Sequence, residues 1–549
     1  MRTFLTVLLL ALPLTLSAQL RESIEVSVLE LDVVVLDRDG KSVDGLTSDD
    51  FEVEIGKRRA GVTNFYAVKR GAIVDEHPAG SPRRAGVSGE TLLPTTVVVF
   101  IDDTRLTQHA KARAIDALKE YVAANVGPAT SAMLVRWNGR LDVRTRPAER
   151  AGPLIAELEK MAKEPAMLND SERRHILKTI DEAMLGITGH KYAHSVQNAW
   201  IRMIGYADRE AREVDQTLDA LREVTRLAGA FEGRKSLLYI SEGLPLQPAA
   251  DLFEYWDRMT RARGVEGLDA DLMETIARNA GGGYNQIMDG MRYDRSRRYH
   301  ELSRQAQALN VPFYAIDVGG ARGLATPGVE EIHRIAQIST TAFRANLQDG
   351  VRMLAHETGG RFIANENDLG RALAVVSEQF DTYYSLGVRA SASTRLAKVS
   401  VKVKARPELR VVAARHRKPL TRDEQIERAV RSRLYLAKSE NPHGAEVAVG
   451  TAANLAGRCV VPVNVFVPRA KIVPAGGAQT LKLHFALLDE LNQESDVRTT
   501  PVPLGPGDLS HPLTIGVRPG RYVLSLAVSD PSTGVTSYLR RDIDASGCR

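Results

Sequence analysis

The strongest constraint on the fold is a change of texture that begins at Thr95. From there short apolar runs recur, and stretches with helical spacing such as AKARAIDALKEYVAANV lie between them. The runs are TTVVVFID, SAMLVRWN, SLLYIS, VPFYAIDV and GGRFIAN. Strands that alternate with helical crossovers predict a mainly parallel sheet with helices on both faces. The segment LDVRTRP, close behind the second run, predicts a hairpin partner that makes one edge antiparallel.

Length and composition indicate a globular chain of several domains. At 549 residues the chain is too long for one ordinary core. Its 44% hydrophobic and 26% charged residues are typical of soluble proteins. The net charge of +5 arises from 73 basic against 68 acidic residues, which are spread along the chain. We therefore expect no nucleic-acid partner.

The first residues are typical of an export signal. Residues 1–18 place one Arg before a short apolar run that closes on small residues, as a secretory signal peptide does. A membrane anchor is the alternative, but the apolar run is short for a bilayer span and nothing downstream supplies a second one. We expect an exported chain, periplasmic or secreted, with no stable membrane span after cleavage. Cys459 and Cys548 could then form a disulfide in the last domain.

The remaining segments are assigned by pattern. Residues 22–70 alternate apolar and polar residues around the turn DRDGK and predict a small β-domain. A linker rich in Pro, Gly and Arg follows at 71–94. The α/β domain is expected over 95–390, with helical insertions at about 165–215 and 247–300.

Three further segments complete the chain. Residues 391–418 predict strands that follow or pack on the N-terminal β-domain. A helix and linker occupy 419–444, where Thr421 is the expected N-cap and Glu424 completes a capping box. Residues 445–549 read as strands separated by Pro and Gly, six or seven in number, and predict a β-sandwich of immunoglobulin or fibronectin type III style.

Several ordered blocks resemble a known family. They are GLTSDDFEV, TTVVVFIDDTRLT, GRKSLLYISEGLP, VPFYAIDVGG and LAHETGGRFIANENDL followed by YYSLGV. Over roughly residues 25–415 the chain resembles the acidobacterial VWFA-related domain family, a divergent branch of von Willebrand factor A domains. The resemblance implies a Rossmann-like von Willebrand A domain that follows the small N-terminal β-domain. The C-terminal β-sandwich lies outside the resemblance and is assigned by pattern only, so the expected fold is a multidomain α/β plus all-β protein.

The resemblance also implies a metal-ion-dependent adhesion site at the carboxyl ends of the strands. The family pattern D-x-S-x-S becomes Asp102, Thr104 and Leu106, and Leu106 supplies no oxygen. Thr107 lies one residue late, and Glu242 stands where an Asp is expected after the fourth strand. The implied ligands of Mg²⁺ or Mn²⁺ are thus Asp102, Thr104, Thr107 and Glu242.

Three questions about this metal site stay open. Thr188 is a further ligand candidate, aligned only by its GITGH context. Arg105 could neutralise the carboxylates without any metal. Asp102 and Asp103 also fit a purely structural role, because Asp residues at a strand end commonly cap the next helix.

Other constellations do not assemble a catalytic site. His300 and Glu301 lack the second His of a zincin, because Arg304 stands there. His190 and His194 have helical spacing but no third ligand in view. Ser241 lacks the glycine elbow of a hydrolase nucleophile. The GGG at 281–283 follows no strand, and we interpret it as a turn rather than a phosphate loop.

The functional expectation is a non-enzymatic protein that binds another protein, in adhesion or assembly. The resemblance implies that an acidic residue of the partner completes the metal's coordination. Two alternatives remain: a structural envelope protein whose A domain has no metal, and an extracytoplasmic hydrolase.

Overall fold

The computed structural model covers the chain, and placement is described for most of it. The described residues are 26–69, 71–78, 95–168, 171–185, 190–231, 233–262, 292–320, 330–391, 397–413, 416–417, 421–436, 440–455, 458–474 and 479–548. The expected signal peptide, Thr188 and the glycines at 281–283 lie outside them. So do residues 79–94 of the expected linker.

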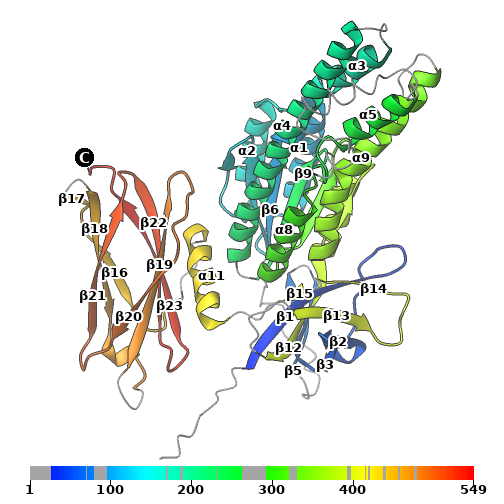
Figure 1. The fold of residues 1–549 in the computed structure, drawn as a ribbon. Coiled ribbons are helices and arrows are strands. Elements are labelled where there is room, and N and C mark those ends of the chain that lie inside the picture. Colours follow the sequence, from blue (N-terminus) through cyan, green and yellow to red (C-terminus); the bar gives the residue numbers. More distant parts are fainter. Residues whose placement is uncertain are drawn as a thin grey trace, which may run out of the picture.

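A mainly parallel sheet forms the centre of the molecule (Figure 1). Its order is β11-β10-β9-β6-β7-β8, and every neighbouring pair is parallel except β7 with β8. The strands are β6 (Thr95–Asp102), β7 (Thr130–Trp137), β8 (Leu141–Val143), β9 (Arg234–Ser241), β10 (Phe313–Asp317) and β11 (Arg361–Ile363). The expected parallel strands and the antiparallel edge are thus present. Counted along the chain, the order is 3-2-1-4-5-6, that of a doubly wound α/β sheet.

Helices cover both faces of this sheet because its strands are apolar on both sides. All residues of β6 and β9 are buried. One face packs on α1 (Gln108–Asn125), α2 (Ala151–Lys163) and α10 (Leu369–Asp381). The other face packs on α4 (His190–Ala230), α8 (Ser296–Leu309) and α9 (Glu330–Thr358). This two-sided core accounts for strands that read as apolar runs rather than as alternating patterns.

A helical projection stands beyond one end of the sheet, on the side opposite to the N-terminal β-domain (Figure 1). It contains α3 (Ser171–Leu185), α5 (Ala250–Ala262) and the first part of the 41-residue helix α4. Its own core includes the paired rings of Trp200 and Trp256, 5.1 Å apart. The insertions expected from the sequence therefore include this helical unit, which extends α4 past the sheet.

The N-terminal β-domain is built from strands that precede the α/β segment in the chain and from strands that follow it. One sheet has the order β14-β1-β12-β4-β5, and a second has the order β15-β13-β2-β3. The strands are β1 (Val26–Leu36), β2 (Phe51–Ile55), β3 (Arg58–Ala60), β4 (Val62–Lys69), β5 (Ala72–Pro78), β12 (Thr382–Ser391), β13 (Ala397–Val403), β14 (Arg410–Val412) and β15 (His416–Arg417).

Two boundaries differ from those expected in this region. Strand β12, expected within the α/β domain, lies between β1 and β4 because its buried Tyr384 packs on Phe51 and Phe65. Strand β5, expected to be linker, pairs with β4.

Helix α11 (Arg422–Tyr435) joins the α/β domain to the C-terminal β-structure. It begins at the expected capping box, in which Thr421 Oγ1 accepts from the Glu424 amide at 3.3 Å. Tyr435 meets Phe231 of the α/β core edge to face, and its hydroxyl donates to Glu494 at 2.8 Å. Apolar residues of α4, α11 and β19 belong to one continuous core.

The C-terminal β-structure consists of two antiparallel sheets around a common core. One has β18 between β21 and the pair β16 and β17, and the other has the order β20-β19-β22-β23. The strands are β16 (Glu446–Val449), β17 (Ala453–Leu455), β18 (Arg458–Val467), β19 (Thr480–Asp489), β20 (Arg498–Pro503), β21 (Leu509–Val517), β22 (Arg521–Ser529) and β23 (Thr536–Asp544). Within the described residues there are thus eight strands, where six or seven were expected.

A disulfide and the lengths of the helices complete the description of the fold. Cys459 of β18 and Cys548 form a disulfide across 89 residues of sequence. Among the described residues, no helix combines the length and apolarity that a membrane crossing requires.

Candidate functional site

The carboxyl ends of the parallel strands bring polar residues to one edge of the sheet. β6 ends at Asp102, β9 ends just before Glu242, and β10 ends at Asp317. Ser241 and Asp317 are direct partners in the β9–β10 register. Residues separated by more than two hundred positions therefore meet at the usual ligand edge of an open α/β sheet.

Asp102 caps the turn that follows β6. Its Oδ1 accepts from the Thr104 amide at 3.1 Å and from the Thr104 hydroxyl at 2.5 Å. Its Oδ2 accepts from the Tyr239 hydroxyl of β9 at 2.7 Å. The structural role considered for Asp102 is therefore present in this geometry, since one carboxylate oxygen caps the short helix η2 (Asp103–Arg105) and the other binds β9.

Glu242 and Thr107 form a second pair. Glu242 Oε1 accepts from the Thr107 amide at 2.7 Å and from its hydroxyl at 2.6 Å. Thr107 is also the N-cap of α1, accepting from the Ala110 amide at 3.4 Å. Glu242 thus places its charge at the amino end of a helix, where negative charge is favoured.

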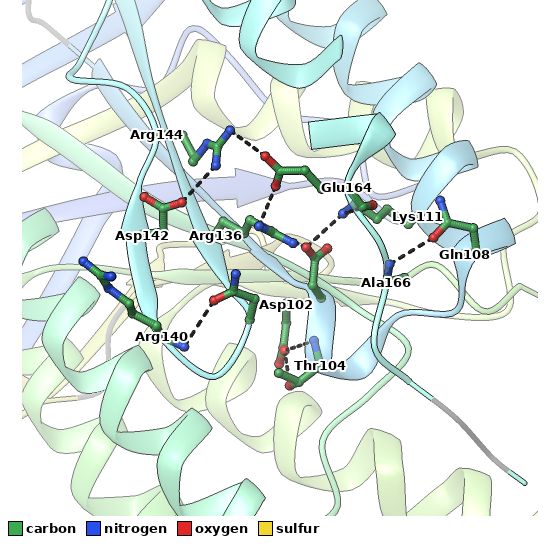
Figure 2. A network of polar contacts seen from close by, with 12 residues as sticks. Asp102, Thr104, Gln108, Lys111, Arg136, Arg140, Asp142, Arg144, Glu164 and Ala166 are labelled. Atoms are coloured by element: carbon green, nitrogen blue, oxygen red, sulfur yellow. Dashed lines mark hydrogen bonds and ion pairs between the residues drawn. The ribbon is translucent and has the colours of Figure 1, made fainter. Parts of the chain in front are cut away.

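Asp103 belongs to a different network, on the other side of the loop. Its buried carboxylate pairs with Lys111 at 2.9 Å and with Arg136. Figure 2 shows how the chain of ion pairs continues from Arg136 to Glu164 at 2.5 Å and from Glu164 to Arg144 at 2.9 Å. Asp103 does not line the pocket described below. It therefore has a structural role in joining β6, α1 and β7.

Leu106 and Arg105 decide what this loop can bind. The Leu106 side chain is fully buried in the core with α1 and β6, so it leaves the third oxygen position of the family pattern without a donor. Arg105 is 5% exposed, and Coulombic attraction links it to Asp102. A cationic side chain therefore lies beside the carboxylate that the resemblance assigns to a metal.

Burial raises the pKa of Asp102 to about 6. Hydrogen bonds from Thr104 and Tyr239 and the charge of Arg105 oppose this shift but do not cancel it. The ordinary value is 3.8, so the folded protein holds this proton more tightly than the unfolded chain does between pH 4 and 6. The negative charge at Asp102 thus costs stability above that interval.

We expect Asp102→Asn to stabilise the α/β domain at pH 7 by about 3 kcal/mol, because the neutral amide avoids the cost of burying a charge. The advantage should be fully present well above pH 6 and shrink as the pH falls to 4, where the wild-type carboxyl is protonated in the folded state and nearly half-protonated in the unfolded one. Urea unfolding of both proteins from pH 4 to pH 8 measures it. A difference that stays constant with pH would contradict this account.

A pocket of about 360 Å³ lies beside these residues. Thr104, Arg105, Glu242 and Asp317 line it from the sheet edge, whereas Asp102 and Thr107 do not line it. The other walls come from α3, α4 and α9, through residues that include Arg173, Tyr206, Arg209, Glu210, Glu213, Phe343, Leu347 and Gln348. The base of the helical projection therefore covers the edge at which the sequence predicted a binding site.

Asp317 was not recognised from the sequence. It ends its strand as Asp102 does, and its carboxylate accepts from Gln348 at 2.8 Å and from the Gly319 amide at 2.9 Å. A search for acidic residues at every strand end would have found it. Glu210 and Arg173 carried no such signal, because they lie within long amphipathic helices.

The residues set aside as catalytic candidates have ordinary surroundings. His300 is half-exposed on α8 and lies 3.2 Å from Glu357. Ser241 is buried, and its Oγ accepts from the Gly243 amide at 3.1 Å. The side chains of His190 and His194 lie outside the described residues. Within the described part of the chain, no cluster of three His, Cys, Asp or Glu has the arrangement of a metal site.

Comparison with known proteins adds little to this description. No family model and no curated protein matches the sequence. Among solved structures, a β-glucuronidase of Bacteroides uniformis is similar over 30% of this chain and 19% of its own length, with 11% identity and a TM-score of 0.15. The chain therefore spans less than a fifth of that protein, and a likeness of this degree carries no argument about fold or function.

Proposed function

We propose that this is an exported, non-enzymatic protein that binds another protein through a divergent von Willebrand factor A domain. The observation that carries the proposal is the pocket at the carboxyl ends of the strands, where Thr104, Glu242 and Asp317 meet. The doubly wound strand order with its antiparallel edge is compatible with such a domain. The buried disulfide supports export, because such bonds persist in oxidising compartments.

In this mode of binding the partner needs no metal ion. Mg²⁺ prefers near-octahedral oxygen coordination, and the ligands that the resemblance implies are Asp102, Thr104, Thr107 and Glu242. The four side chains fall into two closed pairs, Asp102 with Thr104 and Glu242 with Thr107. Leu106 supplies no oxygen, and a guanidinium already lies near Asp102. These oxygen atoms therefore fit a divalent cation poorly. Metal binding by the four residues stays a prediction from the resemblance.

The test is capture of a partner from the envelope or medium on immobilised protein, in Mg²⁺ and in EDTA. Met167 lines the pocket and is 53% exposed, and Ile201 of α4 is equally exposed but does not line it. We expect Met167→Glu to abolish capture by repelling an acidic group at the entrance. Ile201→Glu serves as the matched control and should retain capture in either buffer.

Other results would redirect the proposal. A partner retained only in Mg²⁺ would support a metal-dependent adhesion site. Equal loss with both variants would place binding elsewhere on the helical projection. Absence of a partner under all conditions, together with a stable multimer, would favour the structural envelope protein.

A further inference from the structure

A buried arginine in the pocket wall carries donors for which the described residues supply no hydrogen-bond acceptor. The Arg105 side chain lines the pocket and is 6% exposed, and its Nε and Nη2 have no hydrogen-bond partner among the described residues. Buried donors are nearly always paired, because an unmade hydrogen bond leaves the cost of desolvation uncompensated. A buried guanidinium in this condition points to an acceptor other than those of the described residues.

The nearest carboxylates do not fill that role. Glu210 Oε1 lies 3.6 Å from Arg105 Nη1, and Glu213 Oε2 lies 3.8 Å from Nη2. Both separations exceed the usual length of a hydrogen bond. Glu210 uses its other oxygen to accept from the Ala249 amide at 2.8 Å, and Glu213 is 57% exposed to water. The two acids balance the charge of Arg105 but leave its donors open.

Two other arginines of the pocket have partners of their own. Arg173 donates from Nε to buried Asp251 at 2.9 Å. Arg209 is bonded to Glu172. Arg105 is therefore distinguished from them by its unmet donors rather than by its charge.

We propose that Arg105 binds a carboxylate directly inside this pocket, with no metal ion between them. A guanidinium presents paired N–H groups that match the two oxygens of a carboxylate. The volume of about 360 Å³ accommodates a small organic acid or one acidic side chain of a partner. The inference rests on the proposed function, since it names the group that the same pocket recognises.

The probes are succinate and its neutral analogue succinamide, together with two blocked peptides, Gly-Asp-Gly and Gly-Asn-Gly. Calorimetric titration of the full chain in EDTA should show binding of succinate and of the Asp peptide, and none of the neutral analogues. The two acids separate a free small molecule from a protein side chain as the source of the carboxylate.

Three variants locate the binding group. Arg105→Lys keeps the charge but loses the planar pair of donors, and we expect succinate to bind about 10- to 100-fold more weakly. The double variant Arg105→Gln, Glu210→Gln removes both charges together, which avoids a buried unpaired carboxylate, and should lose binding. Arg258→Gln is the matched control, because this arginine of α5 pairs with Glu254 at 2.8 Å and does not line the pocket, and it should bind as the wild type does.

The outcomes separate this inference from the proposed function. Binding of succinate but not of the Asp peptide supports the carboxylate site and counts against a protein partner at this pocket. Partner capture without binding of either acid overturns the carboxylate site and leaves the proposed function standing. The inference is also overturned if neutral analogues bind equally well, if Mg²⁺ is required, or if the Arg105 variants bind like the wild type.

Discussion

Replacing Asp103 by Asn should destabilise the α/β domain by about 3–5 kcal/mol, because it leaves buried cations without their shared counter-charge. Lys111 is fully buried, and besides Asp103 its ammonium donates to the backbone carbonyl of Glu164 at 3.0 Å. Arg136 keeps Glu164 but loses Asp103. Urea-dependent hydrogen exchange of peptides from β6 and β7 measures the stability of this domain separately from the others.

A matched Asp→Asn variant on α1, the helix that carries Lys111, serves as control. Asp116 pairs with Lys119 at 2.8 Å, but its side chain is 72% exposed. Asp116→Asn should therefore change stability by less than about 1 kcal/mol. Adding Lys111→Met to Asp103→Asn should recover part of the loss, since the buried ammonium is then gone. A loss below that of the control would show that the network of Figure 2 contributes little.

The central sheet could be predicted from the sequence because a strand that is buried on both faces has apolar side chains at consecutive positions. All residues of β6 and β9 are buried, and each strand carries a short apolar run, Val97–Ile101 in β6 and Leu237–Ile240 in β9, between helical stretches. The start of α11 could also be predicted, because Thr421 and Glu424 form a capping box within one helical turn. Both features depend on residues close together in the chain.

The sheet to which a strand belongs could not be predicted in the same way. β12 alternates as a strand should, but its partner β1 lies more than three hundred residues earlier. Alternation fixes the face on which a side chain lies, and says nothing of the neighbouring strand. The chain therefore returns to the N-terminal β-domain at Thr382, although the pattern alone assigned this strand to the α/β domain.

The contacts of single side chains in the candidate site could not be predicted from local sequence either. The sequence around Asp102 is compatible with a cap and with a metal ligand, and both need the same carboxylate at the same strand end. What favours the cap is Tyr239 on another strand, which binds the second oxygen. The setting of Arg105 depends on Glu210, which comes from an inserted helix without any local motif. Long-range contacts thus determine the chemistry that local sequence leaves open.

Removal of the disulfide is expected to destabilise the C-terminal β-structure by about 4–5 kcal/mol, because the bond closes a loop of 89 residues in the unfolded chain. Cys459 lies in β18, and Cys548 follows β23 of the facing sheet, so the bond joins the two layers of the structure. Both side chains are buried in the common core. The bond therefore limits the freedom of the unfolded chain without cost to packing in the folded one.

The measurement compares the wild type with the double variant Cys459→Ala, Cys548→Ala by urea-dependent hydrogen exchange in peptides from β18 and β22. The urea midpoint of exchange should fall for these peptides. It should change much less for peptides from β6, which lies in a separate sheet. Reduction of the wild type should reproduce the effect of the variant, since both remove the same loop constraint. If the variant matched the oxidised wild type, the stability of this β-structure would derive from its core and from α11, which packs against β19 and β22.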